Sequence, residues 1–96
     1  MCINEFGKAV YMIRNNRDEQ AKDMAKRINI TPSSLSTACR KNNRMTTSRL
    51  DQYYNSIIAE YDLTPTESEY LRESYLATKR EIEYRKANNI VLEGRY

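Results

Sequence analysis

The sequence predicts an all-α fold, and three observations lead to this prediction. Apolar residues recur at helical spacing along most of the 96 residues, and no segment before the last few residues alternates as a half-buried strand does. Two glycines and two prolines are too few for the many turns of an all-β fold. Each proline follows a threonine, and Thr-Pro suits the first turn of a helix.

The first helix is expected between about Asn4 and Asn15. Its buried face is predicted to comprise Phe6, Ala9, Val10 and Ile13, which follow helical spacing. A short loop should follow this helix. Asp18 is expected to cap the second helix, because Asp is a favoured N-cap residue and its charge complements the helix dipole.

A pair of short helices is expected between residues 21 and 41. The apolar face of the first comprises Ala21, Met24, Ala25 and Ile28. Asn29 tolerates left-handed backbone and should end this helix, while Thr31 should cap the next, with Pro32 in its first turn. The second helix should face back through Leu35, Ala38 and Cys39. Such a pair is a helix-turn-helix, whose second helix can enter the DNA major groove.

The outward face of that second helix carries short hydroxyl and basic side chains. These are Ser33, Ser34, Ser36, Thr37, Arg40 and Lys41. Hydroxyl groups can bond to several base edges, and an arginine can bond to guanine through two hydrogen bonds. The alternative interpretation is a solvated face with capping serines, although a merely solvated face more often carries Glu/Lys pairs.

Positive charge gathers in the half of the chain that contains this motif. From Arg14 to Arg49 there are nine basic and three acidic residues, a net charge of +6, whereas the net charge from Leu50 onward is −3. A basic half that coincides with the motif indicates binding to phosphates.

Two further helices are expected in the second half. Thr47 or Ser48 should cap the fourth, whose apolar stripe comprises Leu50, Tyr53, Tyr54, Ile57, Ile58 and Tyr61. A capping box at 64–67 should open a last helix of about 23 residues that ends at Asn88-Asn89. One stripe of this helix comprises Leu71, Tyr75, Thr78 and Ile82, and a second stripe comprises Tyr70, Ala77 and Tyr84.

The segment MAKRINITPSSLSTACRKNNR, residues 24–44, resembles the helix-turn-helix of the phage-repressor (Cro-like, XRE) family. The matching positions are Met24-Ala25, the turn residue Asn29, Ile30-Thr31-Pro32 and Leu35-Ser36. FGKAVYMIR at 6–14 is similar to the family's first helix, and LTPTE at 63–67 to the start of its last. The resemblance covers roughly residues 6–76. It implies a five-helix, lambda-repressor-like DNA-binding domain, here with an extended C-terminal helix and a short tail.

Two positions depart from the family pattern. Members often carry Glu near the end of the recognition helix, paired with an Arg of the first helix; here Arg14 is present, but the matching position is Cys39. A Gly that often follows is replaced by Lys41. One internal salt bridge of the family is therefore expected to be missing.

The resemblance implies a sequence-specific transcriptional regulator, typically a repressor of phage or mobile-element type, that binds double-stranded DNA as a homodimer. From the resemblance and the charge pattern together, the residues expected to contact DNA are Arg17, Thr31, Ser33, Ser34, Ser36, Thr37, Arg40, Lys41, Asn43, Arg44 and Arg49.

Residues 1–77 are expected to form the DNA-binding domain, and residues 78–96 an extension for dimerisation or partner binding. The expected dimer contacts are Ile82, Tyr84, Ile90, Val91 and Leu92. The alternative function is a protein-interaction module, such as an antitoxin or phage inhibitor, whose last helix and tail bind a toxin or another protein.

Several classes of function have no support in the sequence. The chain has no histidine, and Cys2 and Cys39 are far apart, so neither a metal site nor a disulfide is expected. It has no glycine-rich phosphate loop and no nucleophile–base pair, so neither an enzyme nor a cofactor is expected. No apolar run approaches the roughly 20 residues of a membrane span, and the N-terminus does not resemble a signal peptide. A cytoplasmic protein is therefore expected.

Overall fold

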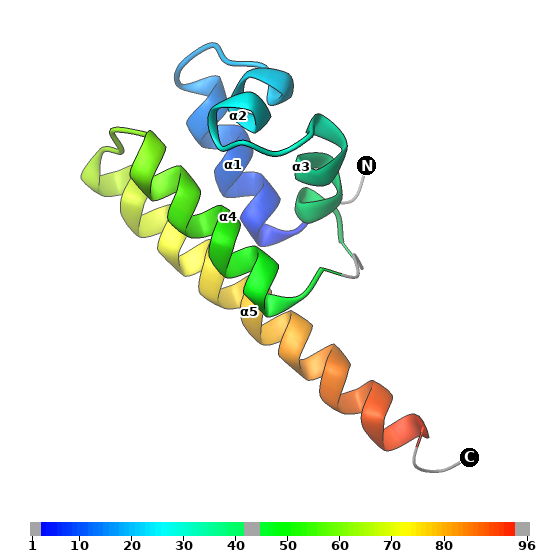
Figure 1. Ribbon diagram of the computed structural model, residues 1–96. Helices are drawn as coiled ribbons and strands as arrows, with labels where there is room; N and C mark the ends of the chain where they lie inside the picture. Colours follow the sequence, from blue (N-terminus) through cyan, green and yellow to red (C-terminus); the bar gives the residue numbers. More distant parts are fainter. Residues whose placement is uncertain (1–2, 42–44, 94–96) are drawn as a thin grey trace.

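The computed structural model describes residues 3–41 and 45–93, with side chains described as far as residue 87. Five α-helices account for most of these residues (Figure 1). They are α1 (Glu5–Asn15), α2 (Ala21–Arg27), α3 (Pro32–Cys39), α4 (Thr47–Glu60) and α5 (Pro65–Glu93). The all-α prediction is therefore confirmed for the described part of the chain, whose β pairing is limited to an isolated bridge between Ile3 and Arg40.

α1 is the central helix of the fold, because it packs against both α5 and α3. α2 packs on α3, and α4 runs antiparallel to α5 (Figure 1). The largest fully buried apolar side chains are Phe6, Val10, Ile13, Met24, Leu35, Leu50, Ile57 and Leu71. The predicted buried face of α1 is confirmed in full. In α4 one predicted position was wrong: Ile58 is 43% exposed, because the stripe was wider than the single face that packs on the core.

The turn between α2 and α3 has the geometry that the sequence predicted. Asn29 adopts a left-handed conformation, with φ of 64°. Its N–H donates to the carbonyl of Lys26 at 3.2 Å, and the N–H of Ile30 donates to that of Ala25 at 2.8 Å. These two bonds satisfy the last carbonyls of α2 as a Schellman motif does. The hydroxyl of Thr31 then accepts from the N–H of Ser34 at 3.0 Å and starts α3.

Two of the expected N-cap residues were wrong. Asp18 does not cap α2, since it takes a left-handed φ of 52° in the preceding loop, and Gln20 is the N-cap. The N–H of Gln20 donates to the carboxylate of Asp23 at 3.0 Å, one half of a capping box. At α4 the cap is Thr46, whose hydroxyl accepts from the N–H of Arg49 at 3.2 Å. The observed N-caps therefore lie one or two residues from the predicted ones.

The last helix is longer than the sequence predicted. α5 continues through Asn88-Asn89 to Glu93, so residues 90–93 belong to the helix and not to a tail. Asparagine costs only about 0.7 kcal/mol relative to alanine inside a helix, which does not stop one that is already propagating. Beyond the bundle the end of α5 extends away from the other helices (Figure 1).

Packing also continues across residue 77, where the expected domain boundary lay. Thr78 is buried, and its hydroxyl accepts from the N–H of Phe6 at 3.0 Å. Ile82 is 8% exposed and belongs to the core. The expectation that Ile82 contacts a second chain is therefore wrong, because it lies within reach of the bundle. The side chains of Ile90, Val91 and Leu92 lie outside the described residues.

Candidate nucleic-acid interface

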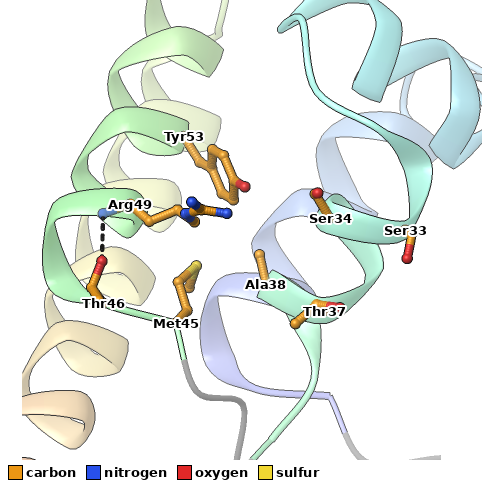
Figure 2. A pocket seen from close by; sticks show the side chains of 8 residues that line it. All are labelled: Ser33, Ser34, Thr37, Ala38, Met45, Thr46, Arg49 and Tyr53. Carbon is orange, nitrogen blue, oxygen red and sulfur yellow. Dashed lines mark hydrogen bonds between the residues drawn. The ribbon is translucent and has the colours of Figure 1, made fainter.

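A groove of about 440 Å³ lies between the outward face of α3 and the first turns of α4. α3 contributes Ser33, Ser34, Thr37 and Ala38, and the α4 side contributes Met45, Thr46, Arg49 and Tyr53. In Figure 2 the side chains of Arg49 and Met45 on the α4 side lie opposite those of Ala38 and Thr37, while Ser33 lies on the side of α3 that faces away from α4. Four hydroxyl groups and one guanidinium border the groove in addition to Tyr53, so its walls are rich in hydrogen-bonding groups.

The hydroxyl groups along α3 are not all equally available. Thr31 caps the helix and also donates to the hydroxyl of Ser34 at 2.8 Å. Ser33 and Ser36 are exposed, and Thr37 is half-buried beside the groove. The structure thus places all five predicted hydroxyl residues on or next to α3, and three of them lie outside the Thr31–Ser34 pair.

The predicted basic residues near α3 come from both sides of the groove. Arg49 is exposed on α4, and its guanidinium is directed across the groove toward α3 (Figure 2). Arg40 is the C-cap of α3, and its guanidinium lies 3.5 Å from the hydroxyl of Thr37. Lys41 is exposed directly after it. Asn43 and Arg44 lie outside the described residues.

Among the predicted DNA contacts that lie in the described residues, Arg17 is placed away from α3 and the groove. Its guanidinium makes two hydrogen bonds to the carboxylate of Glu67, at 2.7 and 2.9 Å, and one to the carbonyl of Asp62 at 3.0 Å. These contacts join the end of α1 to the start of α5, and none of these residues lines the groove. Although Arg17 is near the motif in sequence, it forms a structural ion pair with Glu67.

Asn4 and Gly7 position α3, and neither role was predicted from the sequence. The side-chain amide of Asn4 donates to the carbonyls of Ala38 and Arg40, at 2.8 and 3.1 Å, while its oxygen accepts from the N–H of Gly7 at 2.6 Å. The backbone N–H of Asn4 donates to the carbonyl of Cys39 at 2.9 Å. Asn4 therefore caps the start of α1 and the end of α3 together.

Gly7 lets α1 and α3 approach closely at the same place. A Cβ atom on Gly7 would lie 2.5 Å from the carbonyl oxygen of Cys39 and 2.9 Å from its Cβ, too close for any larger residue without movement of α3. An asparagine before the first apolar-periodic residue and a glycine inside a helix were the available sequence signals.

Cys39 occupies the position where the family pattern would place Glu. Burial raises the pKa of its thiol to about 11, and the nearby guanidinium of Arg14 only partly opposes this effect. Arg14 donates instead to the carbonyl of Glu19 at 3.1 Å and lies over the ring of Tyr11. A thiol that stays protonated at neutral pH packs as a small apolar group and is not a nucleophile.

No protein-family model, curated protein or solved structure matches the chain. Among the described residues no three His, Cys, Asp or Glu side chains gather as a metal site would require. In the same residues no helix combines the length and the apolar composition that crossing a membrane would take.

Proposed function

We propose that this protein is a helix-turn-helix regulator of transcription that binds double-stranded DNA, with α3 as the recognition helix of a lambda-repressor-like domain. The observation that carries the proposal is the groove, in which the hydroxyl face of α3 meets Arg49 at the start of α4. The helix α3 follows directly after the left-handed turn at Asn29 and packs on α2.

The chemistry of the groove suits a DNA duplex. Short side chains, such as Ser33 in the groove and Ser36 elsewhere on the exposed surface of α3, allow the backbone of α3 to approach base edges, and hydroxyl groups can donate or accept there. Arg49 across the groove and Lys41 after the end of α3 provide positive charge for phosphates of the DNA backbone. The N-terminus of α4 begins beside the groove, at Thr46, and a helix N-terminus favours an anion through the helix dipole.

The first test is selection of duplexes from a random-sequence pool, followed by anisotropy titrations with an enriched duplex and with a scrambled one. Specific binding should be salt-dependent and tighter for the enriched duplex. Arg49→Ala should weaken binding to both duplexes and lower the slope of log K against log salt by about one unit. Lys86→Ala is the matched control, because it removes the same charge from an exposed position on α5.

A pool that yields no enriched sequence, with affinity that does not depend on salt, would contradict the proposed function. An unchanged salt slope in Arg49→Ala, with specific binding intact, would remove only Arg49 from the interface. Equal losses in Arg49→Ala and in Lys86→Ala would indicate a general charge effect and not a site in the groove.

A further inference from the structure

α5 carries a stripe of residues on a flank that the core leaves uncovered. This stripe, here called the α5 seam, comprises Tyr70, Glu73, Ala77, Arg80 and Tyr84. Its members follow at intervals of three, four, three and four residues, the spacing of a helix face that packs against another helix. Tyr70 and Tyr84 are 37% and 68% exposed. Ala77 is half-buried but does not belong to the hydrophobic core cluster.

The α5 seam lies apart from the surfaces that α5 already uses. Thr78 points into the core. Tyr75 stacks on Tyr54 of α4 with ring centroids 4.1 Å apart, and Lys79 pairs with Asp51 of α4 at 3.4 Å. At about 100° per residue, Tyr75 and Lys79 lie on the opposite side of the helix from Ala77. A further helix can therefore reach the seam without displacing α4.

The sequence of the seam is symmetric in size and antisymmetric in charge about Ala77. Tyr70 and Tyr84 each lie seven residues from it, while Glu73 precedes it by four and Arg80 follows it by three. Glu73 and Arg80 are both exposed. The contact of Glu73 with the neighbouring Arg72, at 3.7 Å between two exposed side chains, contributes little.

Such a pattern is complementary to itself when two helices run antiparallel. With a two-fold axis at Ala77, Tyr70 of each copy lies beside Tyr84 of the other, and Glu73 lies beside Arg80 with an axial offset of only about 1.5 Å. The small side chain of Ala77 allows the helices to approach at the axis. A parallel pair would instead bring Glu73 against Glu73 and Arg80 against Arg80, and like charges would repel.

We propose that the α5 seam is a homodimer surface, on which a second copy of this chain packs antiparallel with Ala77 at the two-fold axis. The proposal does not depend on DNA binding, and its test contains no DNA. This interface lies on one flank of α5 before and after residue 77, whereas the contacts expected from the sequence lie at residues 82–92.

Sedimentation equilibrium of the full-length chain tests the proposal through charge exchange. The unaltered protein should show a monomer–dimer equilibrium in the micromolar range. Glu73→Arg and Arg80→Glu should each weaken the dimer about tenfold or more, since each sets like charges side by side. The double exchange Glu73→Arg with Arg80→Glu should restore the dimer to near its original affinity. Lys86→Glu, which reverses an exposed charge on the opposite side of α5, should leave the affinity unchanged.

Three outcomes would overturn the proposal. One is a full-length chain that stays monomeric at high micromolar concentration, which would leave the seam for a different protein. Another is a dimer that neither single exchange weakens. The third is a dimer that both single exchanges weaken but the double exchange does not restore, because an antiparallel pair requires that rescue. Circular dichroism of each variant should match that of the unaltered protein, since all the substituted positions are exposed.

Discussion

Side-chain hydrogen bonds join both ends of α1 to the rest of the chain, but the two ends use different kinds of side chain. At its C-terminal end the contacts are ionic and centre on Glu67, while at its N-terminal end they are neutral and centre on Asn4. The ionic end joins the loop after α1 to the start of α5. The neutral end joins the start of α1 to the last turn of α3, the helix proposed to read DNA.

The ionic end is a connected network of charged and aromatic side chains. Glu67 accepts from Arg17, from the side chain of Asn16 at 2.8 Å and from the N–H of Thr64 at 3.0 Å. Next to it, Arg27 pairs with Glu19 at 2.7 Å and lies over the ring of Tyr61, whose hydroxyl donates to Glu19. The network ties the ends of α2 and α4 to the same corner of the fold.

The arginines of the basic half have two different roles in the structure. Arg17 and Arg27 belong to the same basic half of the sequence as Arg49, yet both are committed to carboxylates inside the chain. Arg49 faces the groove. A net charge of +6 over the segment therefore overstates the charge offered to a ligand, because Arg17 neutralises Glu67, which lies outside that segment. The pairing of Arg27 with Glu19 is already counted in the net charge.

Removal of Glu67 should break the ionic end and have the largest effect on stability. Its side chain is only 5% exposed, and Glu67→Ala leaves Arg17 and Asn16 without their common partner. We expect a loss of about 3 kcal/mol in the free energy of unfolding, measured with urea. Glu69→Ala, which removes an exposed carboxylate two residues further along, should change stability by less than about 0.5 kcal/mol.

The substitution Glu67→Ala should not change DNA binding. The DNA affinity of the folded fraction of Glu67→Ala should equal that of the unaltered chain, since Glu67 does not line the groove. A selective loss of DNA affinity at unchanged stability would show that Arg17 and Glu67 act at the interface after all.

The ionic end should also make stability depend on pH in the acid range. Hydrogen bonds from Arg17 hold the pKa of Glu67 at about 2, below the ordinary 4.5, in spite of the opposing effect of burial. A carboxylate whose pKa is depressed by folding stabilises the protein above its ordinary pKa and loses that contribution as the pH falls toward the depressed value. The stability difference between the unaltered chain and Glu67→Gln should therefore shrink between pH 4.5 and about 2. A constant difference over that range would mean that the ion pair does not form.

Most local features could be predicted from the sequence because each depends on a few neighbouring residues. The left-handed turn at Asn29, the cap at Thr31 and the capping box at Thr64 were all confirmed. The apolar face of α1 was predicted completely for the same reason. Helical periodicity and N-cap chemistry are rules of short range, so they hold before the tertiary structure is known.

Features that join distant residues could not be predicted in this way. The partner of Arg17 is 50 residues away in Glu67, and the partner of Phe6 is 72 residues away in Thr78. The place where α1 meets α3 depends on how the helices cross, and only the structure shows that Gly7 lies against Cys39. The predicted dimer contact at Ile82 failed for a similar reason, since the length of the core along α5 was unknown.

Substitution of Asn4 should break the neutral end, with a smaller effect on stability and a larger one on binding. Asn4→Ala removes the cap of α1, together with the buried hydrogen bonds that its side chain makes to the carbonyl of Ala38 and to the N–H of Gly7. We expect a loss of about 2 kcal/mol in the free energy of unfolding. Because the last turn of α3 then loses a fixed position, the DNA affinity of the folded fraction should also fall, by about tenfold.

The control for this prediction is Asn55→Ala, which replaces an exposed asparagine within α4. That variant should bind normally and be slightly more stable, because alanine is the better helix former. The stability difference between the unaltered chain and Asn4→Ala should stay constant over the acid range, because the side chain of Asn4 does not ionise and Glu67 is present in both proteins. If Asn4→Ala lost stability but bound DNA with full affinity, the end of α3 would be positioned by its packing against Gly7 alone, and the two ends of α1 would differ only in their response to pH.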